Sequence, residues 1–219
     1  MSTRLPNSFR KMIPGGAEET RSEESLGFWT VRYFVDARLA LVATFERTGR
    51  PVHAMTFDAE GRAHGLEREW HPSGRLRYEA RYVDGLQHGL QRQWDEQGRL
   101  IVRTRLVRGT GLDLYCGDLR PGVVSESREL VGGLRHGFER SWTDGKLTEE
   151  KLFVRGVEHG ISRRWTLAGK LERGWPRFFV RGQRVTRGAY VRACRSDASL
   201  PPWRAARDRA SRARPLAVR

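Results

Sequence analysis

The chain has 219 residues, of which 41 are Lys or Arg and 26 are Asp or Glu, so its formal net charge is +15. Only four of the basic residues are lysines, a bias toward arginine that a GC-rich genome can produce unaided. The charge therefore permits an anionic partner without requiring one. Hydrophobic residues make up 38% of the chain and prolines number nine, which permits a folded core and argues against full disorder.

The cysteines and the apolar runs bear on the compartment. Cys116 and Cys194 lie far apart and form no Cys-x-x-Cys motif, which argues against a disulfide framework or a zinc cluster. The first 27 residues balance four basic against four acidic side chains and contain no apolar signal core. The longest nearly apolar run, Leu39 to Phe45, is far shorter than the roughly 20 residues of a membrane helix. We therefore expect a soluble, cytoplasmic protein.

A repeated segment, Gly-x-x-His-Gly, organises the middle of the chain. With Gly109 included, its first glycines are spaced by 24, 24, 24 and 23 residues, which indicates an internal repeat. After each full copy an apolar residue, an arginine and a tryptophan alternate with other residues, a period of two that predicts a strand. A turn ending in glycine and a strand opened by leucine follow, so each unit is predicted to be a β-hairpin. The repeat positions are Gly61, His64, Gly65 and Trp70; Gly85, His88, Gly89 and Trp94; Gly133, His136, Gly137 and Trp142; and Gly156, His159, Gly160 and Trp165.

Turn lengths predict the cross-strand pairs. A three-residue loop whose last residue, Gly74, is left-handed sets Trp70 opposite Leu76, and the same count pairs Trp94 with Leu100. The fourth unit is one residue shorter, yet a two-residue Asp-Gly loop, favoured for a type I′ turn, again sets its tryptophan opposite a leucine. The same register predicts Arg68 opposite Tyr78, Arg92 opposite Val102, Arg140 opposite Glu149 and Arg163 opposite Arg173, with Trp142 opposite Leu147.

These observations predict an all-β protein: a single meandering antiparallel sheet of consecutive β-hairpin repeats, about 24 residues each, over residues 28–192. Residues 1–27 are expected to be a flexible N-terminal segment. Residues 193–219 form a basic, Arg-rich C-terminal tail, for which disorder and a short helix beginning near Trp203 both remain open. The third unit, residues 109–132, lacks the histidine, so its hairpin is either distorted or bears a specific loop.

The order Gly-x-x-His-Gly, Trp, Gly-x-Leu resembles the variant MORN repeat of the YwqK-type antitoxin family. The resemblance covers about residues 45–182, with four good copies. It implies a meander of hairpins and a role in binding, such as neutralising a cognate toxin in a bacterium. No catalytic residues come with the family. The degenerate third copy and the Arg-rich tail depart from the pattern, so the resemblance does not transfer a particular partner.

Two chemistries are conceivable for the repeated histidines and tryptophans. Stacked repeats would place the histidines in a column, as a metal site needs, but a histidine in a tight turn also hydrogen-bonds backbone groups and braces the next hairpin. The tryptophans could stack on nucleic-acid bases or hold neighbouring hairpins together. We expect the structural role for both sets and therefore no metal and no cofactor.

The repeated arginines are the candidate partner-binding residues. Strand alternation puts each arginine on the face that carries the tryptophans, where a column of guanidinium groups could bind carboxylates or phosphates bidentately. Ion pairs within the chain are the alternative, and both stay open. These residues are Arg68, Arg92, Arg140 and Arg163.

The chain contains no Gly-x-Ser-x-Gly elbow, phosphate-binding loop or His-Glu-x-x-His motif. We therefore expect no catalysis and no small-molecule substrate. The first hypothesis is a non-catalytic repeat protein that binds a protein partner, in the manner of an antitoxin or immunity protein that inhibits by occlusion. The alternative is a basic module that binds nucleic acid or anionic membrane lipid through its arginines. If the partner is a toxin, its binding surface is expected to be acidic.

Overall fold

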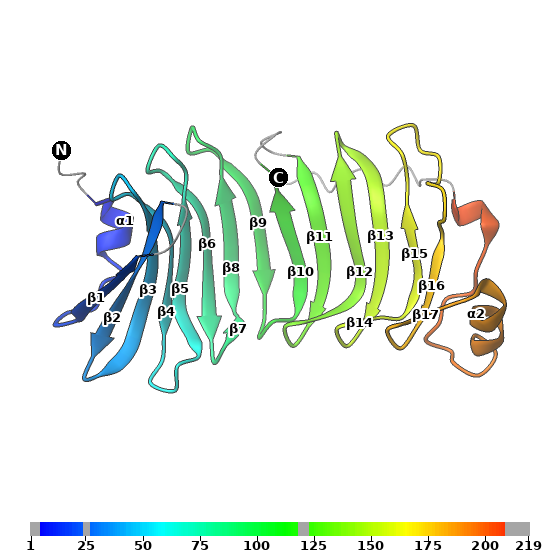
Figure 1. Ribbon diagram of the computed structural model, residues 1–219, viewed down its shortest axis with the longest axis horizontal. Helices are drawn as coiled ribbons and strands as arrows, with labels where there is room; N and C mark the ends of the chain where they lie inside the picture. Colours follow the sequence, from blue (N-terminus) through cyan, green and yellow to red (C-terminus); the bar gives the residue numbers. More distant parts are fainter. Residues whose placement is uncertain (1–4, 24–26, 118–122, 209–219) are drawn as a thin grey trace. The chain divides into compact units, whose positions relative to one another are not determined.

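A computed structural model describes residues 5–23, 27–117 and 123–208. It is mostly β, with antiparallel hairpins following one another along the chain (Figure 1). The chain divides into two compact units, residues 1–108 and residues 109–219, which are described separately. None of the described helices is both long and apolar enough to cross a bilayer.

The first unit contains a short helix and a nine-stranded antiparallel sheet. Strands pair in sequence order from β1 to β6, then β8 and β9, with β7 paired to β6 (Figure 1). This order is the one expected of a meander, because each strand turns back beside its predecessor. The elements are α1 (Asn7–Arg10), β1 (Glu18–Glu23), β2 (Phe28–Val35), β3 (Arg38–Glu46), β4 (Pro51–Phe57), β5 (Ala63–Trp70), β6 (Leu76–Val83), β7 (Leu86–Gln87), β8 (Gly89–Trp94) and β9 (Leu100–Leu106).

The second unit contains an eight-stranded sheet with the order β10, β11, β12, β13, β15, β16, β17, and β14 paired to β13. A helix and a 3₁₀ turn follow its last strand. The elements are β10 (Gly111–Cys116), β11 (Val124–Val131), β12 (Leu134–Thr143), β13 (Lys146–Val154), β14 (Val157–Glu158), β15 (Gly160–Arg164), β16 (Arg177–Val180), β17 (Gln183–Val185), α2 (Arg187–Ala193) and the 3₁₀ turn η1 (Ala205–Asp208).

The turn chemistry explains the hairpins. In the β5–β6 turn, the N–H of His71 donates to the carbonyl of Arg75 and the N–H of Gly74 donates back to His71. Gly74 has φ of +80°, the left-handed conformation that glycine adopts without steric cost. In the β12–β13 turn both Asp144 (φ +54°) and Gly145 (φ +73°) are left-handed, as a type I′ turn requires.

The predicted tryptophan–leucine pairs are confirmed, and the predicted arginine pairs are wrong. Trp70 lies opposite Leu76, but Arg68 lies opposite Glu79 rather than Tyr78. The reason is a β-bulge directly after the turn, which inserts one extra residue into β6 between the two pairs. The same bulge recurs in two further hairpins, where Trp94 pairs with Leu100 and Arg92 with Arg103, and Trp142 pairs with Leu147 and Arg140 with Glu150. In the last hairpin Trp165 bridges Leu171, but Ser162 already pairs with Arg177, so Arg173 does not lie opposite Arg163; on its other side Arg163 lies opposite Glu150 of β13.

Residues 5–23 are folded, contrary to the expectation of a flexible segment over residues 1–27; residues 1–4 and 24–26 lie outside the described residues. The α1 region places Phe9 and Met12 against the sheet, where both are buried, and β1 pairs along β2. Phe9 makes edge-to-face contacts with Phe45 and Trp70, with ring centroids 5.3 and 5.7 Å apart. Because α1 covers the apolar side chains of β2 to β5, it caps that end of the first sheet.

The C-terminal side of the second unit is also capped. Tyr190 of α2 is fully buried with Ile161, Phe178 and Leu200, and Trp203 packs at the edge of this cluster. Burial raises the pKa of the Tyr190 hydroxyl well above its ordinary value, and the neighbouring Cys194 adds to the shift. For the tail, where disorder and a short helix near Trp203 were both left open, the structure shows the 3₁₀ turn η1; residues 209–219 lie outside the described residues.

The described residues therefore form two antiparallel sheets of consecutive hairpins. The single continuous sheet, the uniform 24-residue unit and the domain limits 28–192 stay predictions. In the third repeat, residues 109–132, β10 and β11 form a hairpin whose register shifts at Tyr115 and Cys116. Its connecting segment, residues 118–122, lies outside the described residues.

Candidate functional site: the tryptophan face and its arginines

The repeated histidines each join their hairpin to the next one through a hydrogen bond. In each repeat the histidine Nδ1 accepts a hydrogen bond from the backbone N–H that opens the next left-handed turn. His159 accepts from Arg181 at 2.9 Å and His88 accepts from Arg108 at 3.3 Å. The corresponding contacts are Asp84 to His64 at 3.5 Å and Arg155 to His136 at 3.4 Å. These bonds satisfy turn donors that the strand ladder leaves open, which is a structural role.

The third repeat, residues 109–132, makes a corresponding hydrogen bond with another side chain. Thr110 stands where the histidine is missing, and its hydroxyl accepts a hydrogen bond from the N–H of Gly132 at 3.0 Å. Gly109 lies so close to this turn that a Cβ placed on it would be 2.4 Å from the backbone nitrogen of Gly133. The glycine is therefore required by backbone packing as well as by its positive φ. The sequence signal for this substitution was the Gly-Thr-Gly segment itself.

One group of side chains has the composition of a metal site. Oxygen and nitrogen atoms of Asp58, His64 and Asp84 all lie within 4.8 Å of one another. Arg62 lies among them, however, and donates to Asp58 at 2.9 Å and to Asp84 at 3.3 Å. Partial burial acts to raise the pKa of Asp58, but hydrogen bonds from the backbone and side chain of Arg62 outweigh it and lower that pKa. The guanidinium thus supplies the positive charge that a cation would bring.

Three of the four repeat tryptophans are buried: Trp70, Trp142 and Trp165. Trp94, by contrast, is only half-buried. We call the side of each sheet that carries these residues its tryptophan face. It carries Arg68, Trp70, Arg92 and Trp94 in the first unit and Arg140, Trp142, Arg163 and Trp165 in the second, since residues two apart on a strand share a face.

In each unit one glutamate joins the repeat arginines. Glu79 accepts from Arg68 at 2.6 Å and from Arg92 at 3.2 Å. Glu150 lies 2.9 Å from Arg140 and 3.8 Å from Arg163. The structure thus brings the candidate arginines of each unit together. They meet at Glu79 and Glu150, which the register predicted from the sequence had not placed beside them.

The repeat arginines differ in how much of the side chain is accessible. Arg163 is 6% exposed and Arg68 is 15% exposed, whereas Arg92 is 36% exposed and, among the described residues, has a single ion pair. Arg140 is 29% exposed and also lies over the ring of Phe138, 4.3 Å from its centroid. Of the four, Arg92 is therefore the most available to a partner.

Further arginines surround Arg92 on the tryptophan face of the first unit. Arg103 lies directly opposite Arg92 on β9, Arg105 is two residues farther along β9, and Arg81 is two residues beyond Glu79 on β6. Arg81, Arg103 and Arg105 are exposed, and no ion pair or hydrogen bond joins their side chains to any part of the chain that the structure describes. Like charges directly opposite on neighbouring strands are destabilising. We call Arg81, Arg92, Arg103, Arg105 and Trp94 the arginine patch.

Arg81, Arg103 and Arg105 were not among the partner-binding residues expected from the sequence. The alternation Arg103-x-Arg105 in the sequence indicates that these two side chains share a face of β9. Placing that face beside Arg92 requires the register of β8 with β9, which the bulge in β9 determines. The exposed Leu100, half of whose surface is accessible, lies opposite Trp94 and extends the patch with an apolar edge.

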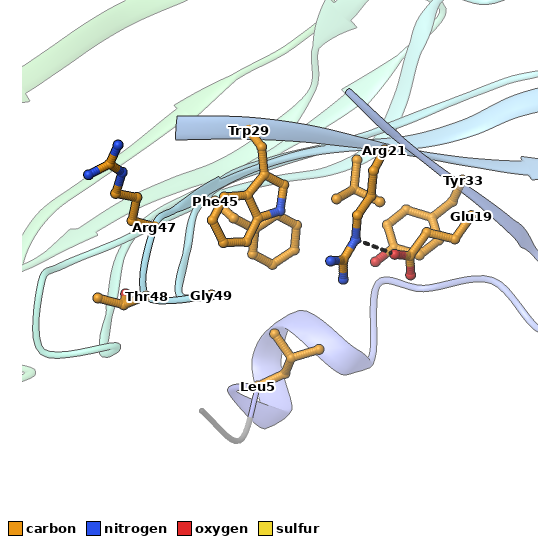
Figure 2. Close-up of a pocket in the computed structure, with 10 residues that line it drawn as sticks. Leu5, Glu19, Arg21, Trp29, Tyr33, Phe45, Arg47, Thr48 and Gly49 are labelled. Carbon is orange, nitrogen blue, oxygen red and sulfur yellow. Dashed lines mark hydrogen bonds and ion pairs between the residues drawn. The ribbon is translucent and has the colours of Figure 1, made fainter. Parts of the chain in front are cut away.

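A cavity of about 400 Å³ lies between α1 and strands β1 to β3 (Figure 2). Its walls include Trp29, which stacks on Phe45, and the ion pair of Arg21 with Glu19 at 3.0 Å. Burial and the nearby Glu19 charge raise the pKa of Tyr33 to about 12, so this phenol is neutral at pH 7. Arg21 is neutralised by Glu19, and Arg47 is the other charged residue of the lining.

No protein-family model matches the chain, and no curated protein matches it at a significant level.

Proposed function

We propose that the protein is a non-catalytic binding protein that occludes an acidic surface of a partner protein through the arginine patch of its first unit. The observation that carries the proposal is the group of exposed Arg81, Arg103 and Arg105 around Arg92, with the half-buried Trp94 two residues along β8; none of the three has a side-chain ion pair within the described residues. Arginine and tryptophan are the residue types that dominate binding energy at protein interfaces. Guanidinium groups also bind carboxylates with fixed geometry.

The proposal keeps the antitoxin-like role that the resemblance to the variant MORN repeat implies, with an acidic toxin as the partner. The repeat supplies the scaffold as a run of about 24-residue hairpins, continuous in our proposal across residues 28–192. The location proposed is the cytoplasm, in keeping with the two free thiols, Cys116 and Cys194. Binding by a rigid sheet face needs no catalytic group, metal or cofactor.

Nucleic acid is the second candidate partner. A half-buried indole among arginines is the combination that stacks on a base while the guanidinium groups contact phosphates. Such binding loses affinity steeply as salt rises, because it releases counterions. Anionic lipid, the other partner of the alternative hypothesis, would show the same salt dependence through the same arginines.

The test is affinity capture from a lysate of the source organism, with nuclease treatment and at low and high salt. The triple variant Arg81→Gln, Arg103→Gln, Arg105→Gln is compared with a control that removes the same charge from exposed arginines of the second unit. The proposal expects one acidic protein that survives nuclease and high salt and is lost only with the patch variant. Equal retention by both variants, or capture of nucleic acid or lipid alone, would refute it. The control variant is Arg155→Gln, Arg184→Gln, Arg195→Gln.

A further inference from the structure

The Arg-x-Trp pair of the repeat binds the protein's own chain at one place in each unit. In the first unit, Arg68 donates to the backbone carbonyl of Ser8 at 2.6 Å, and the indole N–H of Trp70 donates to the Ser8 hydroxyl at 2.9 Å. One residue of α1 therefore satisfies both members of the pair, through its carbonyl and through its side-chain oxygen.

The second unit repeats this recognition with a different segment. Arg163 donates to a carboxylate oxygen of Asp208 at 3.0 Å, and the indole N–H of Trp165 donates to the Asp208 carbonyl at 2.8 Å. Trp203 donates to the other carboxylate oxygen at 3.3 Å. Again one residue offers a carbonyl and a side-chain oxygen, although the two capping segments come from opposite parts of the sequence.

The pair Arg92 and Trp94 has the same spacing on β8 but no such occupant in the described residues. Arg92 keeps only its 3.2 Å contact with Glu79, and no hydrogen bond from the indole of Trp94 is present within the part of the chain that the structure describes. Arg103 lies opposite Arg92 and Arg105 two residues farther along β9, and neither side chain is paired with any of the residues that the structure describes. This site therefore offers the same two donors as the occupied pairs, in a more cationic setting.

We infer that Arg92 and Trp94 form an open docking site for a partner polypeptide segment that presents an acidic residue. In the bound state the partner's carboxylate accepts from Arg92, as Asp208 accepts from Arg163, and its backbone carbonyl accepts from the indole N–H of Trp94. The neighbouring arginines favour acidic residues on either side of this anchor. The inference rests on the proposed function and specifies the chemistry of the same surface.

The experiment is an NMR titration of the full chain with acetylated, amidated Ala-Asp-Phe-Asp-Ala-Asp, compared with its counterpart in which each Asp is Asn. The readout is the indole N–H signal of Trp94, assigned by loss of that signal in Trp94→Phe. We expect the Asp peptide to shift this signal and to bind at least tenfold more tightly than the Asn peptide. An unshifted Trp94 signal, or equal binding of the two peptides, would overturn the inference.

Variants separate a specific site from general attraction to a basic protein. Arg92→Gln is expected to weaken binding at least tenfold, whereas Arg184→Gln, which removes the same charge from an exposed position in β17, is expected to leave it unchanged. Equal losses would overturn the inference. Failure of this inference can be told apart from failure of the proposed function. If the triple variant loses the captured partner but the peptide leaves the Trp94 indole signal unshifted, only the docking site is refuted. If the peptide shifts the Trp94 signal but no protein is captured from the lysate, only the proposed function is refuted.

Discussion

Replacing Phe9 by alanine tests the capping of the first unit. Phe9 is fully buried and contacts Phe45 and Trp70 edge to face, so its removal takes a large aromatic side chain out of the core. A buried Phe→Ala substitution costs about 3–5 kcal/mol of unfolding free energy. The expected consequence is loss of α1 from the sheet, which also releases Arg68 and Trp70 from Ser8.

The measurement is urea unfolding followed by the amide NMR signals of Val31 and Val102, two buried residues of the first unit. Phe28→Ala is the matched control, because Phe28 lies in the same sheet but is 42% exposed, and its loss should cost about 1 kcal/mol or less. Equal losses in the two variants would show that α1 contributes little to the stability of this unit, and would refute the capping argument.

Three further predictions follow from close contacts and shifted pKa values. Gly109→Ala should destabilise the second unit far more than Gly98→Ala destabilises the first, because an added Cβ meets backbone at 2.4 Å in one case and open space in the other; similar melting temperatures would contradict this. Thr110→Val should cost about 1 kcal/mol of unfolding free energy by removing the acceptor for the Gly132 N–H, measured by chemical denaturation. Burial acts to raise the pKa of the Asp95 carboxyl, but hydrogen bonds from Arg99 outweigh this effect, and the net result is a lowered pKa. The stabilisation by this carboxylate is therefore present above the unfolded-state pKa of about 3.9 and is lost as the pH falls below that value. Asp95→Asn should therefore flatten the acid limb of the stability curve; an unchanged limb would contradict the assignment.

The hairpins and the histidine braces could be predicted from the sequence because their determinants are local. A glycine at a left-handed position and a fixed loop length decide which residues face each other, as the pair of Trp70 with Leu76 shows. His159 could be assigned a bracing role for the same reason, since it stands in a tight turn whose N–H groups need acceptors.

The partners of the arginines could not be predicted, because one extra residue in each bulge moves every later pair. Arg140 therefore meets Glu150 instead of Glu149. The caps were missed for another reason. Ser8 contacts Arg68 from 60 residues away and Asp208 contacts Arg163 from 45 residues away, and neither segment shares the repeat pattern. Only the folded chain shows that the Arg-x-Trp pair binds a peptide segment.

Arginine-specific labelling by phenylglyoxal, read by mass spectrometry with and without the captured partner, tests the central claim most directly. The account predicts that the partner protects Arg81, Arg92, Arg103 and Arg105 from modification. Exposed arginines of the second unit, such as Arg155, should react equally in both samples. Unchanged labelling across the arginine patch in the complex would contradict the claim that this face binds the partner.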